Sequence, residues 1–270
     1  MQKLAKKIAL FLLLLAPFAA QAGTTELTWY GHAAFRIVTP RGHVLLIDPW
    51  ITNPSNQNGK ADLAALGKAD LILLTYDHFD HVGDSVAIAR KTGARLVATP
   101  GLGRAMAKHG YPAGQMGPDT LDRLGGQLTL LGGEVKIALI PALHSSTVTE
   151  SKEAASVHDG GRPSGFLITI ADGPTIYDTG DTDDFSDMVL VRKFHRPVDV
   201  MLAAIGGRYT MGSERTAEAV KLVDPKVVIP MHYSNEAILD GTPLALQRAL
   251  AYKNSPARVK VLKIDQPASF

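Results

Sequence analysis

Four apolar segments of this 270-residue chain each run directly into a histidine or an aspartate. The segments and the polar residues behind them are Leu71–Thr75 with His78, Asp80 and His81; Val135–Pro141 with His144; Thr175–Tyr177 with Asp178 and Asp181; and Val227–Pro230 with His232. Short apolar runs of this kind are typical of buried strands. Because sites in layered α/β proteins lie beyond the carboxyl ends of strands, we expect the four polar clusters to converge.

Strand-like and helix-like patterns alternate through both halves of the chain. Besides the four segments above, the patterns predict strands over 27–30, 34–38, 43–47, 95–98, 127–131, 166–170, 198–204 and 259–264, and helices over 84–92, 101–109, 183–194, 213–223 and 243–252. Asn53–Gly59 is predicted to be a polar loop. Many strands with interspersed helices predict an α/β protein in which two sheets form a sandwich with helices on both outer faces.

The first 22 residues have the three parts of a secretory signal peptide. Lys3, Lys6 and Lys7 form a basic start, Ile8–Ala20 is almost wholly apolar, and Ala20–Ala22 has the form of a cleavage site. The apolar run is shorter than the ~20 residues that a membrane anchor needs. We therefore expect a mature chain that starts near Gly23, carries no membrane span, and is periplasmic or secreted.

Cysteine content and charge narrow the function classes. The chain has no cysteine, which excludes a disulfide framework and a lipid-modified leader. Loss of the leader removes three lysines and leaves 25 basic against 26 acidic residues, a net charge of −1. No basic stripe interleaved with aromatic residues is present, so we expect a small-molecule substrate rather than a nucleic-acid partner. The oligomeric state stays open.

Asp77-His-Phe-Asp-His81 is the segment that most strongly indicates a metal site. A lone histidine such as His144 is more often a hydrogen-bonded structural residue, and turn formation alone would favour the aspartates around Asp181. Two imidazoles and two carboxylates beside a buried strand, however, would be costly to desolvate without a partner. Four such strand ends together favour metal binding. The remaining histidines divide into His43, His109 and His195, expected to be structural or solvated, and His32 and His158, which could approach a site.

Asp77-His-Phe-Asp-His-Val-Gly-Asp84 resembles the H-x-H-x-D-H signature of the metallo-β-lactamase superfamily. The chain is similar in particular to the metal-dependent hydrolases related to ascorbate-6-phosphate lactonase. The supporting stretches are Tyr30–Phe35, Leu46–Pro49, Ile176–Thr182, Ile205–Gly212 and Ile229–Tyr233, which span nearly all of the chain after the leader. The resemblance implies one four-layer αββα domain over residues 23–270.

The resemblance also implies two adjacent metal sites. His78 and His144 would serve the first together with the residue at position 76, and Asp80, His81 and His232 would serve the second. Asp181 would bridge the two. The chain departs from the family pattern at position 76, where Tyr76 replaces the first histidine, so the first site is in doubt and the second is intact.

The ligand types set the expected chemistry. Imidazole and carboxylate without thiolate suit Zn, Mn or Fe, in one or two ions. An ion with an open coordination position lowers the pKa of bound water to about 7 and so provides a metal-bound hydroxide at neutral pH. Asp80 and Asp181 could hydrogen-bond that hydroxide and orient it, which makes Asp80 a catalytic candidate.

Three roles are open for Tyr76. It could bind metal as a phenolate, although its ordinary pKa near 10 requires the metal to displace the proton. It could donate a hydrogen bond to the substrate or a developing oxyanion, which leaves one ion at the second site and makes Tyr76 catalytic. It could also only fill space in a degenerate site. We expect the second role, with His78, His144 and Asp181 still able to form a weaker first site.

The substrate is the least defined element. His32, Arg208 and Tyr209 are the candidate substrate-binding residues, and Arg162 and His158 belong to a loop that could cover the site. The resemblance suggests an exported hydrolase of an ester, lactone or phosphoester. The alternative is a non-catalytic metal- or ligand-binding relative with a degenerate first site. An oxidoreductase on the same scaffold is less favoured, because no flavin or electron-relay segment is visible.

Overall fold

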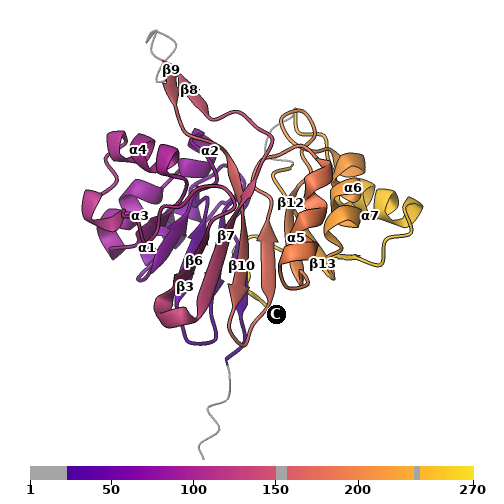
Figure 1. Cartoon of the computed structure of the whole chain (residues 1–270), viewed down its shortest axis with the longest axis horizontal. Coiled ribbons are helices and arrows are strands. Elements are labelled where there is room, and N and C mark those ends of the chain that lie inside the picture. Colours follow the sequence, from indigo (N-terminus) through magenta and orange to yellow (C-terminus); the bar gives the residue numbers. More distant parts are fainter. Residues whose placement is uncertain (1–22, 150–156, 234–237) are drawn as a thin grey trace, which may run out of the picture.

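The computed structural model describes residues 23–149, 157–233 and 238–270, in which two sheets pack face to face with helices outside them (Figure 1). The predicted signal peptide lies outside the described residues. The first sheet has the order β15-β1-β2-β3-β4-β5. Its strands are β1 (Glu26–Trp29), β2 (Phe35–Val38), β3 (Val44–Ile47), β4 (Leu71–Leu73), β5 (Arg95–Val97) and β15 (Ala268–Ser269).

The second sheet has the order β14-β13-β12-β11-β10-β7-β6. Its strands are β6 (Gln127–Leu130), β7 (Val135–Pro141), β10 (Ser164–Ile170), β11 (Thr175–Asp178), β12 (Val200–Ala204), β13 (Val227–Met231) and β14 (Arg258–Val259). A separate hairpin of β8 (Thr147–Thr149) and β9 (Val157–Asp159) projects from one end of the molecule (Figure 1).

Alternation along the strands creates three apolar layers. On β7, Ile137 and Leu139 face the other sheet and join the core between the sheets, whereas Ala138 and Ile140 join the core beneath the helices. Helices α1 (Gly59–Ala65), α3 (Ser85–Thr92) and α4 (Pro100–Lys108) cover the first sheet, and α5 (Val189–Phe194), α6 (Ser213–Val223) and α7 (Pro243–Tyr252) cover the second. Three short 3₁₀ helices over 113–115, 131–133 and 186–188 complete the set. The αββα sandwich expected from the sequence is confirmed.

Strand directions bring the polar clusters to one edge of the sandwich. Strands β3 and β4 are parallel in the first sheet, as are β11, β12 and β13 in the second. Strand β7 is antiparallel to β10, which is antiparallel to β11, so β7 also ends at the edge where β11 and β13 end. The residues that follow β4, β7, β11 and β13 therefore converge.

Most predicted elements are present, with local differences. The predicted strand 259–264 is reduced to β14, because the chain crosses between the sheets here: Val259 pairs with Val228 of the second sheet, whereas Ile264 bridges to Trp29 of the first. Helix α1 follows the predicted loop at Gly59, and α2 (Phe79–Val82) is a single turn inside the metal-type segment. None of the helices in the described ranges is both long and apolar enough to cross a bilayer.

Candidate metal centre

A pocket of about 390 Å³ opens where the strand ends converge. The residues that line it are His32, Tyr76, His78, Phe79, Asp80, His144, Ser145, Asp181, Tyr209, His232 and Leu239. All six metal ligands predicted from the sequence meet here: five line the pocket, and the sixth, His81, is fully buried beneath it. We call His32, Asp80, His81 and His232 the His232 half, and Tyr76, His78 and His144 the Tyr76 half. Asp181 lies between them.

Helix α2 distributes the residues of the metal-type segment. His78 precedes the helix in extended conformation, and the single turn then directs Phe79 to solvent, Asp80 to the pocket and His81 to the interior. The turn ends at Gly83, which has a φ of 39° and lies against Trp50. A Cβ at Gly83 would lie 2.5 Å from the Trp50 Cα, so only glycine fits at this helix end.

His81 is oriented by a buried carboxylate that the sequence analysis did not single out. Its Nδ1 lies 2.6 Å from Asp48 Oδ2, and Asp48 also accepts hydrogen bonds from the amide and hydroxyl of Thr75. This leaves His81 Nε2 directed at Asp80 and Asp181, 4.0 and 3.5 Å away. A carboxylate behind a histidine in this way is the usual support of a metal-binding imidazole.

His232 and His32 hold each other in place. The His232 amide donates to the His32 carbonyl at 3.1 Å, and the Trp29 indole donates to the same oxygen at 2.9 Å. Both histidines have left-handed backbone, with φ of 55° and 51°, as does Asp48 at 41°. Such conformations are uncommon for residues other than glycine and persist where surrounding contacts enforce them. The His232 half is therefore built on three enforced backbone positions.

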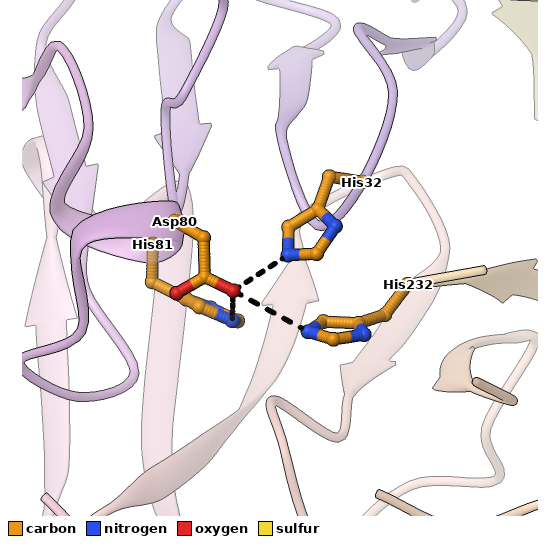
Figure 2. A group of neighbouring side chains, drawn as sticks. All are labelled: His32, Asp80, His81 and His232. Atoms are coloured by element: carbon orange, nitrogen blue, oxygen red, sulfur yellow. Dashed lines mark hydrogen bonds and ion pairs between the residues drawn. The ribbon is translucent and has the colours of Figure 1, made fainter. Parts of the chain in front are cut away.

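The side chains of the His232 half gather around one carboxylate oxygen (Figure 2). Asp80 Oδ2 lies 2.9 Å from His32 Nε2, 3.7 Å from His232 Nε2 and 4.0 Å from His81 Nε2. Each of the four residues offers one possible ligand atom, and these four atoms all lie within 4.8 Å of one another. His32, expected from the sequence to contact the substrate, thus lies within this buried cluster.

Asp181 contacts both halves of the pocket. Its Oδ2 lies 3.1 Å from His232 Nε2 and 4.0 Å from His144 Nε2. The contact with His232 is an ion pair whose atoms are not aligned as a hydrogen bond. The same oxygen accepts a 2.8 Å hydrogen bond from the Tyr76 hydroxyl. Burial would raise the pKa of Asp181, but the charges of His232 and His81 outweigh it and hold the pKa well below its usual range.

The two halves differ in protonation, except at His32 of the His232 half, where burial lowers the pKa. Burial lowers the pKa of His232, but Asp181 and Asp80 outweigh it and raise the value to about 9. Burial also lowers the pKa of His81. The charges of Asp181, Asp48 and Asp80 raise it by more, so the pKa of His81 lies well above its usual value. In the Tyr76 half burial prevails and lowers the pKa of His78 and His144, which are neutral imidazoles at pH 7.

Tyr76 fills the space between the halves. It is fully buried, and its ring centroid lies 4.4 Å from those of His78 and His81 and 4.9 Å from that of His144. Burial, followed by the charges of Asp181 and Asp80, raises the Tyr76 pKa far above its usual value. In the metal-free protein the side chain is therefore a neutral phenol and a hydrogen-bond donor.

The donor atoms of the centre fit a divalent ion. Among the described residues, His81 Nε2, His232 Nε2 and Asp181 Oδ1 are buried without a hydrogen-bond partner. Buried polar atoms in this state are costly, and a cation would satisfy all three. Imidazole nitrogens with carboxylate oxygens suit Zn, Mn or Fe. The geometry thus matches the expected second site more closely than the first.

The other predicted residues take varied positions. Tyr209 lines the pocket, and Arg208 lies over the Tyr209 ring at 5.8 Å without lining the pocket itself. Arg162 is exposed, and its carbonyl accepts from Thr99 of the turn before α4; the side chain of His158 lies outside what the structure describes. His43 and His109 pair with Glu134 and Asp77, in agreement with structural roles.

Two buried aspartates stand behind the site: Asp48, which the sequence analysis did not single out, and Asp178, which it named at the end of the same strand as Asp181. Asp48 directly follows β3 and lies before a proline, so the sequence indicates a turn there, although the Leu46–Pro49 stretch contributed to the family resemblance. Asp178 is fully buried, and burial, with the neighbouring Asp48, raises its pKa well above the usual value, which favours the protonated form. In the D-T-G-D segment only Asp181 reaches the pocket.

Residues 26–232 match the family model of the β-lactamase superfamily domain. A UPF0173 metal-dependent hydrolase of Thermodesulfovibrio yellowstonii is 49% identical over 262 residues, which cover 97% of each chain. A second one, from Anaeromyxobacter sp. strain K, is 46% identical over 252 residues, covering 93% of this chain and 89% of the other. The solved structure of Igni18, a metallo hydrolase of Ignicoccus hospitalis, aligns with a TM-score of 0.78 at 32% identity, over 92% of this chain and 98% of that one. The chain belongs to the β-lactamase superfamily and, within it, to the UPF0173 metal-dependent hydrolases.

Proposed function

We propose that the chain is an exported hydrolase of an ester, lactone or phosphoester that works with a single ion, zinc in the first instance, in the His232 half. The observation that carries the proposal is the set of buried atoms without hydrogen-bond partners, His81 Nε2, His232 Nε2 and Asp181 Oδ1, around Asp80. When bound, a divalent ion supplies Lewis acidity and a hydroxide nucleophile at neutral pH.

The protein's own groups would position the reactants. Burial raises the pKa of Asp80, but His81, His232 and His32 prevail and hold it well below its usual range, so Asp80 remains ionised and can accept a hydrogen bond from a water molecule. Tyr76 keeps its proton and holds Asp181 Oδ2 through its hydroxyl. His78 and His144, neutral and at the pocket wall, are placed to hydrogen-bond a polar group of the substrate.

Metal content tests the single-ion proposal. We expect the purified mature protein to bind one equivalent of zinc by elemental analysis, and His232→Ala to bind none. The control His195→Ala replaces a histidine outside the pocket and should bind one. Tyr76→His restores an imidazole among His78, His144 and Asp181 and should bind a second equivalent. Two equivalents in the wild type would contradict the proposal.

Turnover separates the two candidate functions. The non-catalytic alternative is favoured by the Tyr76 phenol, which occupies the space among His78, His81 and His144 and holds Asp181. A panel of esters, lactones and phosphodiesters should reveal hydrolysis that is lost in Asp80→Ala. Retention of one zinc with no turnover of any member of the panel would favour the ligand-binding alternative.

Export is a separate part of the proposal, supported by the basic start, the apolar run and Ala20–Ala22 of the first 22 residues. Expression of the full chain in a Gram-negative host should give a periplasmic or secreted protein whose first residue is Gly23. A protein that stays in the cytoplasm with an intact N-terminus would contradict this part alone.

A further inference from the structure

Large apolar side chains are exposed around the mouth of the pocket. Among the described residues nine large hydrophobic side chains are exposed, and two of them stand at this pocket. Phe79, 72% exposed, and Tyr209, 52% exposed, line the pocket. Leu143 at 54% and Ile238 at 41% directly precede the lining residues His144 and Leu239. Clustered exposure of this kind marks a binding surface more often than single exposed residues do.

The apolar surface continues from the mouth to the polar floor. The Phe79 ring stands edge-on to Trp50 at a centroid distance of 5.5 Å, and Trp50 stands edge-on to His32 at the same distance. Helix α2 therefore carries both an apolar side chain of the pocket mouth, Phe79, and a polar side chain of the pocket floor, Asp80. A ligand whose polar group reaches Asp80 would lay its adjoining part along Phe79.

Charge at the pocket favours a neutral ligand. No lysine or arginine is among the lining residues that the structure describes, and Arg208, the nearest cation named above, stacks over Tyr209. The acidic side chains that line the pocket are Asp80 and Asp181, so the described lining offers acceptors rather than cations. The described lining of the pocket thus has none of the guanidinium or ammonium groups with which sites usually bind phosphate.

From these observations we infer that Phe79 and Tyr209 form an apolar subsite that binds the acyl or aryl group of a neutral ester or lactone. The inference rests on the proposed function, since it assumes that the bond to be cleaved lies over Asp80. It narrows the substrate class by excluding phosphoesters and small polar lactones.

A chain-length series tests the subsite. With p-nitrophenyl acetate, butyrate and octanoate, kcat/KM of the zinc-loaded wild type should rise by about two- to fourfold per methylene, as partial to full burial of each methylene predicts. Phe79→Ser should reduce kcat/KM at least tenfold more for the octanoate than for the acetate, mainly through KM. The matched control is Phe194→Ser, because Phe194 on α5 is 74% exposed and outside this pocket. Turnover without chain-length dependence, or equal effects of the two variants, would overturn the inference.

A binding measurement separates the subsite from the hydrolytic activity. Trp50 and Trp29 are the two tryptophans of the chain, and only Trp50 contacts Phe79. The neutral, non-hydrolysable ketone 2-decanone should change the tryptophan fluorescence at concentrations at which acetone does not. Trp50→Phe should abolish the signal, and Phe79→Ser should raise the Kd at least tenfold. If no ester is hydrolysed but 2-decanone still binds in this way, the apolar subsite is supported and the proposed hydrolytic function is contradicted. Cosedimentation with phosphatidylcholine–phosphatidylglycerol vesicles that Phe79→Ser abolishes, without ketone binding, would instead assign the rim to a membrane surface.

Discussion

The two halves of the pocket contain the same kinds of side chain but differ in how those side chains are held. In the His232 half, Asp48 orients His81, and the backbones of His32 and His232 are hydrogen-bonded to each other in left-handed conformation. In the Tyr76 half, neither His78 nor His144 is hydrogen-bonded to a carboxylate in the part of the chain that the structure describes. Histidine ligands alone do not make a metal site, because the groups behind them set orientation and basicity.

The difference also explains why a tyrosine is tolerated at position 76. A phenol in place of a histidine of the His232 half would leave the carboxylates there without a cationic or metal partner. In the Tyr76 half the phenol replaces one imidazole, and the two histidines that remain, His78 and His144, are neutral. Its hydroxyl then supports Asp181, which serves the other half. Substitutions in the two halves should therefore have unequal effects.

The largest effect is expected at Asp181, which contacts both halves. Asp181→Asn removes the charge that faces His81 and His232, so zinc content should fall below a tenth of an equivalent and ester turnover by about a thousandfold or more, as loss of the metal's contribution predicts. Elemental analysis and initial rates measure both quantities.

Asp178→Asn is the matched control for that substitution. Asp178, three residues earlier in the same turn, is a buried carboxyl group whose pKa is raised, so an amide preserves its shape and changes its charge less than at Asp181. Zinc content should be unchanged and turnover should stay within about threefold of the wild type. Equal losses in the two variants would mean that packing of the turn, rather than the charge of Asp181, maintains the site.

The next largest effect is expected behind His81. Asp48→Asn keeps the side-chain shape but removes the charge at His81 Nδ1, and should weaken zinc binding by about 10- to 100-fold in competition with a chromophoric chelator. Glu134→Gln is the control, because Glu134 pairs with His43 in the same way, 2.5 Å apart, next to the start of β7 and far from the strand end that precedes His144. A loss of affinity in Glu134→Gln as well would indicate a general destabilisation.

The pH dependence of zinc affinity should also differ between the two halves. The pKa of His232 is raised to about 9 in the metal-free protein, so zinc must displace a proton from it at pH 7. His81, whose pKa is also raised, must lose a proton as well. Zinc affinity should therefore rise by up to about tenfold per pH unit for each proton displaced, and the share of His232 should level off above pH 9. Protonated His232 stabilises the metal-free fold fully below its unfolded pKa near 6.5, and this contribution is lost as the pH rises through 9. In Tyr76→His, zinc entering the Tyr76 half should compete with no proton on His78 or His144 above pH 7. If the zinc affinity of the wild type does not change with pH, the raised pKa of His232 is contradicted.

The smallest effect concerns the hydroxyl that joins the halves. Tyr76→Phe removes the hydrogen bond to Asp181 and should lower the free energy of unfolding of the metal-free protein by about 1–2 kcal/mol. Tyr177→Phe is the control, because the Tyr177 hydroxyl is equally buried but has no hydrogen-bond partner, and its removal should be neutral or slightly stabilising. Urea unfolding monitored by circular dichroism distinguishes the variants, and equal losses would assign no role to the Tyr76 contact.

The sequence predicts the side chains of the site better than their partners. The histidines and Asp181 are recognisable because each follows an apolar strand, a local signal. The contact of Asp48 with His81 depends on the pairing of β3 with β4, which places Asp48 beside Thr75, and no local pattern encodes it. His32 is likewise assigned to the substrate in the sequence analysis, because its position beside Asp80 depends on a backbone contact with a distant part of the chain.

The same distinction applies to the fold. Helices α4 and α7 are predictable because each begins with a Thr-Pro pair whose threonine caps the first turn, at Thr99 and Thr242. The segment 259–264 has the composition of a strand, yet its two ends pair with different sheets, which only the assembled sandwich decides.

The hydrogen bond between the His232 amide and the His32 carbonyl has a consequence for how the protein matures. The two residues are 200 positions apart, so the metal centre cannot exist until nearly the whole chain has been made and its first and last thirds have met. Contacts of such separation form late, because their loop-closure entropy must be overcome before they stabilise anything. A chain truncated before His232 would retain most of both sheets and no centre, and loading with metal would report completion of folding.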